Sequence, residues 1–309
     1  MSRSPTSTVF LVNPASGNGS TGRRWPELAR RASALGLDGE TLFSERAGQL
    51  GELARAAVDA GAKLVVAVGG DGTLNEVANG VVGGNADLAT IPLGTGMDFV
   101  RTHGIPRRFD DAVRVALEGE TRTIDAGRVR YRTWAGEDAE RYFANVGSVG
   151  MSGAVAHRAN GMSKALGGKV TFFYALTRVF LAWQNTEVAV ALDDDVERHG
   201  RMHDVIVANG RWHGGGMFLA PDAEPDDGLF EVVLIGDIGK ADFLTTAPKI
   251  YKGGHVHHRT VEVLRSTRVE VTAPSTLPIE LDGEQVGTTP ATFEIVPGAL
   301  RVRVPRTTS

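Results

Sequence analysis

The first part of the chain alternates short apolar runs with amphipathic segments. Four apolar runs have the length and residue content of strands: residues 8–13, 40–43, 64–68 and 88–92. Three segments have helical spacing of their apolar side chains: residues 25–35, 48–60 and 73–82. Because strand and helix alternate, we expect an α/β domain, in which a parallel sheet has helices on both faces.

The rest of the chain has a different pattern. Beyond Thr121, short runs of alternating apolar and polar residues dominate, separated by turn residues such as Asp194 and Pro274. This pattern predicts a mainly antiparallel β-sandwich as the second domain, with a boundary near Arg122. Residues 168–184 are apolar almost all round, which is typical of a buried core helix; the alternative is a wall for an apolar substrate.

The amino-acid composition argues against several classes of function. The 309 residues are 42% apolar and 23% charged, enough for two globular cores. A net charge of −4 gives no reason to expect a nucleic-acid partner and argues against membrane binding through bulk positive charge, although a local basic patch stays open. The absence of cysteine excludes disulfides and thiolate chemistry. No signal peptide or bilayer-spanning run is visible, so we expect a cytoplasmic protein.

The first candidate for chemistry is the glycine-rich turn at residues 69–72, GGDG, between a strand and a helix. Bare backbone N–H groups and the positive end of a helix dipole at the carboxyl end of a strand form a phosphate cradle. A carboxylate beside a phosphate needs Mg²⁺ or a transferring proton between them, so Asp71 indicates a Mg–nucleotide. The alternative is an ordinary turn, with Asp71 in solvent and Thr73 as helix N-cap.

Two further turns follow strands. Within the turn at residues 14–22, GNGSTG (residues 17–22) fits the G-x-G-x-x-G pattern, with Asp38 and Glu40 near the place of a ribose-binding acid. Pro14, however, stiffens the turn where that fold needs the chain to pass straight into its first glycine. This segment either lies against a nucleotide or is a mobile surface loop. Residues 92–99, PLGTGMDF, place glycines and a hydroxyl on the same sheet edge as GGDG, so we expect these two loops to meet over a ligand crevice.

Five motifs occur in one order along the chain: VNPASGNG, GGDGTLNEVANG, PLGTGMDFVR, PDAEPDDGLFEV and LDGE. In this combination the chain resembles the diacylglycerol kinase catalytic family, specifically its soluble bacterial lipid kinases, over almost its whole length. GGDGT alone would be less specific, because NAD kinases and 6-phosphofructokinases share it. The resemblance implies an ATP-dependent lipid kinase that transfers the γ-phosphate to a lipid hydroxyl such as that of diacylglycerol.

The resemblance also implies a nucleotide-binding domain at residues 1–122, a lipid-substrate domain at residues 123–290, and a tail, residues 291–309, that returns to the first domain. The implied cofactors are ATP and Mg²⁺. By position in the motifs, the residues implied to contact ATP are Asn13, Pro14, Ser16, Gly17, Ser44, Gly69, Gly70, Asp71, Gly72, Thr73, Asn75, Glu76, Gly94 and Thr95. Ser44 stands four residues before Gly48, where the family has a threonine, and serine keeps the hydroxyl.

The LDGE motif supplies Asp282 and Glu284, where the family places its catalytic carboxylates. Phosphoryl transfer to an alcohol needs a base aimed at the hydroxyl. We assign Glu284 as proton acceptor, with Asp282 beside it and Asp71 as Mg–phosphate organiser or alternative base. On the residues alone, a hairpin turn with a solvated glutamate explains the same motif.

The PDAEPDDGL segment resembles the family's structural Mg²⁺ loop. In it, Asp227 would supply a carboxylate, and Glu224 and Leu229 would supply backbone carbonyls, which are hard oxygen ligands that suit Mg²⁺. A solvated acidic turn is the alternative. The histidines at 255, 257 and 258 could bind zinc, but no cysteine or clear fourth ligand accompanies them, so a solvated interdomain loop is favoured.

One residue departs from the family pattern: Met97 stands where the family commonly has asparagine. Because this removes an amide donor and acceptor near the phosphates, one alternative is a nucleotide- or lipid-binding regulator without turnover. The shared GGDGT loop leaves an NAD kinase-like phosphotransferase as another alternative. The expected partners are ATP, a lipid alcohol and a transient membrane surface, with a homodimer left open and no nucleic acid. We expect the protein to act at the membrane periphery, and the sequence does not identify the lipid.

Overall fold

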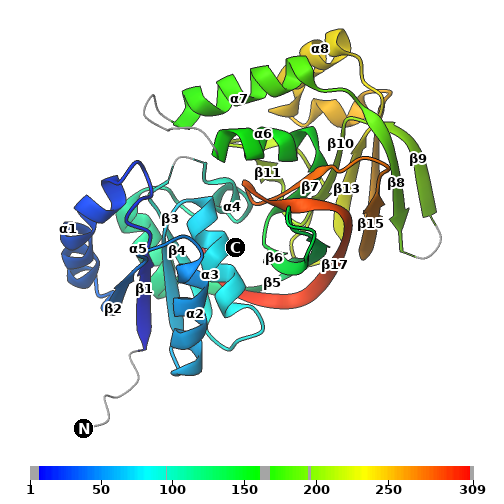
Figure 1. The fold of residues 1–309 in the computed structure, drawn as a ribbon. Coiled ribbons are helices and arrows are strands. Elements are labelled where there is room, and N and C mark those ends of the chain that lie inside the picture. Colours follow the sequence, from blue (N-terminus) through cyan, green and yellow to red (C-terminus); the bar gives the residue numbers. More distant parts are fainter. Residues whose placement is uncertain (1–6, 95, 161–167, 194–195, 307–309) are drawn as a thin grey trace. The chain divides into compact units, whose positions relative to one another are not determined.

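The computed structural model describes residues 7–94, 96–160, 168–193 and 196–306. The chain forms two compact units, Met1–Ile124 with Gly298–Ser309, and Asp125–Pro297. Two strands continue from one unit into the other, β5 (Glu120–Arg132) and β17 (Glu284–Val304) (Figure 1). The confirmed fold class is an α/β domain followed by an antiparallel, sandwich-like β domain.

The first unit is built on a parallel sheet in the order β2-β1-β3-β4. Its strands are β1 (Thr8–Val12), β2 (Glu40–Phe43), β3 (Leu64–Gly69) and β4 (Asp87–Pro92). All six residues of β3 and of β4 are buried, as expected for central parallel strands. The end of β17 adds a parallel partner to β4 through Val302 and Leu88.

Five helices accompany this sheet in the described part of the unit: α1 (Ser20–Ala34), α2 (Gln49–Asp59), α3 (Asp71–Val81), α4 (Asp98–Thr102) and α5 (Phe109–Glu118). The apolar face of α1 buries Trp25 and Leu28 against Phe10, Val66 and Ile91 of the sheet. Helix α3 begins two residues earlier than its apolar spacing predicts, because Gly69 ends β3 and the helix starts directly after the extended Gly70.

A buried carboxylate fastens the last strand to this unit. Asp87, at the start of β4, accepts hydrogen bonds from Arg301 Nε (2.9 Å) and Thr121 Oγ1 (2.7 Å). Arg303 Nε lies 2.9 Å from Asp87 Oδ2, the oxygen that Thr121 also contacts, whereas Arg301 Nε contacts Oδ1. Burial limits solvent screening of these charges, so the contacts hold β17 beside β4 more strongly than an exposed ion pair would.

The second unit is antiparallel. One series of strands runs in the order β14-β13-β10-β7-β16-β17, and a second series, β9-β8-β15, also ends on β17. Their bounds are β6 (Asp138–Phe143), β7 (Val146–Gly150), β8 (Thr186–Leu192), β9 (Val196–Met202), β10 (Asp204–Ala208), β13 (Phe230–Ile235), β14 (Val261–Ser266), β15 (Arg268–Thr272) and β16 (Pro278–Leu281). Strand β6 pairs with β5, and a small pair, β11 (Trp212–His213) and β12 (Met217–Phe218), stands apart.

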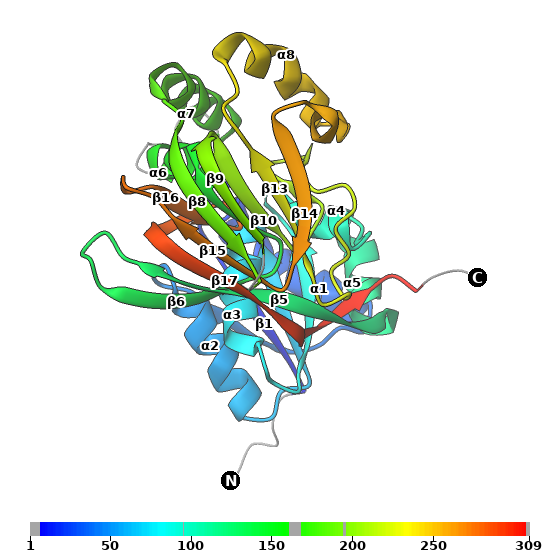
Figure 2. The ribbon, with the colours of Figure 1, turned by 90° about the vertical axis from the view of Figure 1, so that its right-hand side faces the viewer.

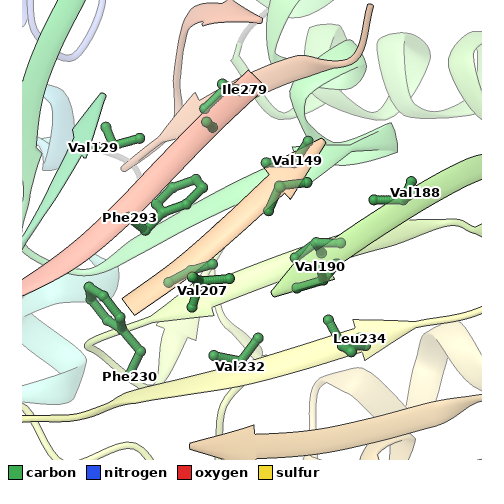
Figure 3. Close-up of a cluster of buried hydrophobic side chains, with 14 of the residues drawn as sticks. Val129, Val149, Val188, Val190, Val207, Phe230, Val232, Leu234, Ile279 and Phe293 are labelled. Atoms are coloured by element: carbon green, nitrogen blue, oxygen red, sulfur yellow. The ribbon is translucent and has the colours of Figure 1, made fainter. Parts of the chain in front are cut away.

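The core of this unit lies between the strands. Val149, Val190, Val232 and Phe293, which come from four different strands, point toward one another (Figure 3). Phe230 stacks near Phe143 with ring centroids 5.8 Å apart. Alternation of apolar and polar residues therefore placed one face of each strand in a shared core.

Three helices and one 3₁₀ turn complete the described part of the second unit: α6 (Met151–Asn160), α7 (Gly168–Ala182), α8 (Lys240–Ile250) and η1 (Gly254–His257). Helix α7 contains most of the apolar segment 168–184. Its Val179 and Phe180 pack on Met151 and Val155, but other large apolar side chains of α7 are exposed, so the expectation of full burial was wrong. No helix in the described ranges is long and apolar enough to cross a bilayer.

Candidate functional site

The carboxyl ends of β1, β3 and β4 carry three loops on one edge of the parallel sheet (Figure 1). The expected meeting of the second and third loops is confirmed. Leu93 N and Gly94 N donate to Gly69 O at 2.8 and 3.1 Å. A Cβ on Gly94 would lie 2.4 Å from the Cα of Gly70, so only glycine allows the two backbones to approach this closely.

Asp71 joins these loops through its carboxylate. One oxygen accepts from Met97 N at 2.5 Å, and the other accepts from Asp98 N at 3.0 Å and Phe99 N at 3.4 Å. Asp71 thus caps the start of α4, where orphan N–H groups favour a negative charge. Arg101 extends the arrangement with a 2.6 Å contact to the Asp98 carboxylate.

The first loop completes the cluster. Asn13 Oδ1 accepts from Ala15 N at 3.0 Å, which closes the turn after β1. A Cβ placed on Gly17 would lie 3.1 Å from Leu93 O, and one on Gly70 would lie 3.9 Å from Ser16 Oγ. Residues of the VNPASGNG, GGDG and PLGTG motifs therefore surround one point at the sheet edge.

Other predicted nucleotide contacts lie deeper or to one side. Thr73 and Asn75 are buried in α3. Glu76 Oε2 accepts from Leu50 N at 3.2 Å and so caps α2. Ser44 directly follows β2, with its N–H on Val12 O at 3.0 Å. Thr95 lies outside the described residues.

In the second unit, Asp282 is held as firmly as Asp71. Its side chain is buried and accepts from Ala144 N (2.9 Å), Asn145 N (3.0 Å) and Val146 N (2.9 Å). Its backbone is left-handed, with φ 48°. Glu284, two residues on, has a side chain 35% exposed, and Arg141 donates to its Oε2 at 2.7 Å. The two carboxylates of LDGE therefore have different surroundings.

A buried network of polar side chains, which we did not predict from the sequence, supports this turn. Glu280 accepts from Ser148 Oγ at 2.8 Å, lies 3.2 Å from His213 Nε2, and also accepts from the N–H of Gly283. Ser152 Oγ links Ser148 Oγ to Asp204, at 2.7 Å from each. Glu280 therefore fixes the turn that carries Asp282 and Glu284. The available signal was a glutamate inside the apolar strand PIEL.

Burial shifts the pKa of Asp204, which belongs to this set of buried polar side chains, and of His203 beside it. It raises the pKa of Asp204 to about 7, against hydrogen bonds from Ser152 that lower it, and the nearby charge of Glu280 adds to the rise. Burial alone lowers the pKa of the neighbouring His203 to about 4. Near neutral pH, His203 is thus uncharged and Asp204 is partly protonated.

The acidic loop at residues 221–229 forms an ion pair with an arginine side chain. Asp227 Oδ1 accepts from Leu229 N at 2.9 Å, while its other oxygen contacts the guanidinium of Arg265. Asp227 N–H reaches Glu224 O at 3.4 Å. In this arrangement Arg265 neutralises the carboxylate that the resemblance gives to Mg²⁺, so Mg²⁺ would have to displace the guanidinium. The metal assignment of Asp227, Glu224 and Leu229 stays a prediction.

The histidine segment does not gather as a metal site. His255 is buried and its Nε2 lies 3.0 Å from Leu219 O, and burial lowers its pKa. The expectation of a solvated loop was wrong for this residue, because the segment folds as η1 within the second unit. Within the described ranges, no group of three or more histidine or acidic side chains is placed to hold a metal.

Comparison with known proteins gives two family matches that together cover most of the chain. Residues 7–129 match the diacylglycerol kinase catalytic domain, and residues 145–304 match the YegS C-terminal NAD kinase beta sandwich-like domain. A diacylglycerol kinase of Mycobacterium tuberculosis is 29% identical over 297 residues, covering 96% of this chain and 94% of that protein. A probable YegS-like lipid kinase of Pseudomonas aeruginosa is 35% identical over 257 residues, covering 81% and 79%.

The fold is shared with solved structures. A crystal structure of a protein described as a putative diacylglycerol kinase from Bacillus anthracis has a TM-score of 0.77 at 20% identity, covering 100% of this chain and 98% of that one. At this identity the likeness concerns the fold alone.

Proposed function

The chain belongs to the bacterial lipid kinases of the diacylglycerol kinase and YegS type, and from this premise we propose that it transfers the γ-phosphate of ATP to a lipid hydroxyl, such as that of diacylglycerol. The observation that carries the proposal is the gathering of three glycine-rich loops on the sheet edge, around Gly17, Gly70 and Gly94. Backbone that approaches so closely suits the phosphates of a nucleotide.

Asp71 supports this role as an organiser of the loops. Its two oxygens accept three backbone N–H groups from the start of α4, so they hold PLGTGMD against GGDG. Mg²⁺ brought with the nucleotide would supply positive charge to the β- and γ-phosphates. We infer that Asp71 keeps the phosphate-facing loops in place and is not the proton acceptor.

Glu284 is the better candidate for the proton acceptor. Asp282 is buried with both oxygens on backbone N–H groups, whereas Glu284 is partly exposed and held at one oxygen by Arg141. In the proposed reaction the lipid hydroxyl oxygen bonds to the γ-phosphorus and its proton passes to Glu284. The bond from that phosphorus to the β–γ bridging oxygen breaks, and ADP leaves.

The assignment of Glu284 is tested by separating transfer from nucleotide binding. Glu284→Gln should lower γ-phosphate transfer to diacylglycerol in mixed micelles by about 100-fold or more and leave ATP binding unchanged. Glu137→Gln, at an exposed glutamate of the same unit, is the matched control and should transfer normally. Full phosphate transfer by Glu284→Gln would show that another group is the proton acceptor. No transfer by the wild type would contradict the proposed function.

The nucleotide loops are tested at Gly94. Gly94→Ala brings a methyl group into the Gly70 backbone, so ATP binding should fall by at least about tenfold. Gly239→Ala is the matched control, because a Cβ there meets nothing within 4 Å. Unchanged ATP affinity in a folded Gly94→Ala protein would place the nucleotide elsewhere.

A further inference from the structure

Large apolar side chains gather on the outer side of two helices of the second unit. Eight large hydrophobic residues are exposed among those the structure describes, and half of them belong to α7 or to α8 and the residue that follows it: Tyr174 (47%), Leu181 (60%), Leu244 (63%) and Tyr251 (57%). We call these four residues and the cations beside them the α7–α8 surface. The other four exposed large hydrophobic residues lie elsewhere in the chain.

Each helix presents these residues as one stripe. On α7, Tyr174, Arg178 and Leu181 follow the spacing i, i+4 and i+7, so they share a face. On α8, Leu244 and Tyr251 share a face with Pro248 by the same spacing. All of these side chains are exposed.

The opposite faces of both helices are already used for packing. Phe180 of α7 stacks on Phe243 of α8 with ring centroids 4.8 Å apart, and Leu176 and Val179 pack on α6. Thr246 and Ile250 of α8 are buried. Both views show α7 and α8 next to each other at one end of the second unit (Figures 1 and 2). The exposed stripes therefore face away from the body of their own unit.

The charges on this surface are positive, although the whole chain carries −4. Arg178, Lys249 and Lys252 are exposed, and within the described ranges none of them has an ion pair. Helix α7 contains no acidic residue, and the single acid of α8, Asp242, contacts Arg259 at 3.0 Å. A cavity of about 530 Å³ beside the end of α7 adds Arg158 to Arg178 in its lining.

We propose that the α7–α8 surface docks on the headgroup region of an anionic bilayer, an inference that rests on the proposed lipid kinase function. Leucine and tyrosine side chains enter the interface between headgroups and acyl chains, and unpaired lysine and arginine side chains attract anionic headgroups. A second copy of the chain fits the surface less well. A symmetric dimer would place the surface against itself, with cations facing cations.

Binding to vesicles tests the docking surface without ATP or turnover. Wild-type protein should sediment with vesicles of phosphatidylcholine containing about one third phosphatidylglycerol, and much less with phosphatidylcholine alone. Lys249→Gln with Lys252→Gln should weaken binding to the anionic vesicles by about 25-fold, or about fivefold for each lysine. Leu244→Ser with Tyr251→Ser should weaken it by about tenfold or more.

Matched controls come from the first unit. Lys63→Gln and Phe43→Ser remove an exposed lysine and an exposed aromatic residue there, and both variants should bind vesicles like the wild type. Wild-type protein that ignores anionic vesicles, or α7–α8 variants that bind like the wild type, would overturn the proposal. A concentration-dependent dimer in sedimentation velocity that Leu244→Ser with Tyr251→Ser abolishes would assign the surface to a second copy.

A second readout separates this proposal from the kinase function. The α7–α8 variants should keep wild-type transfer to a dissolved short-chain diacylglycerol and lose transfer to diacylglycerol presented in anionic vesicles. Equal loss on both substrates would show that the surface belongs to the catalytic machinery and would overturn the docking role. No transfer by the wild type to either substrate would contradict the kinase function, while the vesicle-binding result would still decide the docking surface.

Discussion

At the scale of single residues, the carboxylates in the GGDG and LDGE motifs have two different tasks. Asp71 and Asp282 each accept three backbone N–H groups from a segment far along the chain, so they hold loops in place. Glu284 is partly exposed and paired with Arg141. A carboxylate that must accept a proton in turnover needs access to substrate, and among these three Glu284 meets that need best.

Met97 occupies a position where the backbone is left-handed, with φ 66°, and its side chain is buried. Left-handed backbone costs a residue with a Cβ about 1 kcal/mol relative to glycine. We expect Met97→Gly and Met97→Ala both to be less stable than the wild type, because both lose the buried side chain. Met97→Gly should be the more stable of the two by about 1 kcal/mol in urea unfolding, and the reverse order would contradict the strained backbone.

Asp204 gives a prediction about pH. Its pKa rises from 3.8 to about 7 on folding, so between these values the folded state holds the extra proton, and stability falls as pH rises from about 4 to about 7 and stays lower above 7. Buried His203, with a pKa lowered to about 4, has the opposite sign, since its folded state resists protonation and stability falls as pH drops from about 6.5 to about 4.

Comparing the wild type with Asp204→Asn isolates the contribution of Asp204 to the pH dependence of stability. From pH 5 to pH 8, Asp204→Asn should lose less stability than the wild type, with a difference on the order of 1 kcal/mol or more in urea unfolding. The amide can still accept the N–H of Ser152 and donate to its hydroxyl. Identical pH dependence of the two proteins would show that Asp204 titrates normally.

At the scale of elements, the acidic loop provides a test of the metal assignment. With Arg265 against Asp227, added Mg²⁺ should leave the unfolding temperature of the nucleotide-free wild type unchanged. Arg265→Gln removes the competing cation, so Mg²⁺ should raise the unfolding temperature of this variant. Stabilisation of the wild type by Mg²⁺, to the same extent as the variant, would show that Arg265 does not occupy the metal position.

The last strand depends on its ion pairs with the buried carboxylate of Asp87. Asp87→Ala leaves Arg301 and Arg303 without their carboxylate partner and should lower the free energy of unfolding by about 3 kcal/mol. Arg301→Ala, which leaves Arg303 paired, should cost clearly less, about 1 kcal/mol. Equal effects of the two variants in urea unfolding would contradict the central place of Asp87.

Hydrophobic spacing predicted the four parallel strands of the first unit and three of its five helices, α1, α2 and α3. It did not predict α4, which has only five residues, or α5. Spacing could not predict that β17 runs through Pro290 and Pro297 as one strand, since its partners are chosen by tertiary packing. Helix α7 shows the same limit: an apolar composition predicts a helix, but the exposed stripe of Tyr174 and Leu181 depends on which elements pack beside it.

The motifs predicted the loops of the site but not their supports. Glycine-rich turns after parallel strands placed Gly70 and Gly94 at one edge, as their positions along the sheet require. Glu280 and Ser148 are 132 residues apart, and no local pattern links them. The Arg265–Asp227 ion pair was equally unpredictable, because Asp227 lies in the loop before β13 and meets Arg265 only through the pairing of β13 with β14.

At the scale of the whole molecule, the kinase proposal unites a first unit that carries phosphate-type loops with a second unit that carries the LDGE turn and an apolar, basic surface. An NAD kinase-like reaction would use the same GGDGT loop with a dissolved acceptor, and it gives no role to the α7–α8 surface. A regulator that binds the nucleotide without transferring its phosphate would need affinity for the nucleotide alone.

The most direct test is transfer of labelled γ-phosphate from ATP–Mg²⁺ to several acceptors in parallel: diacylglycerol, monoacylglycerol, a sphingoid base, ceramide and phosphatidylglycerol in mixed micelles, and NAD in solution. We predict label on at least one lipid, no label on NAD, and loss of the lipid label in both Glu284→Ala and Asp71→Ala. Label on NAD alone, or ATP binding with no labelled acceptor, would contradict the lipid kinase.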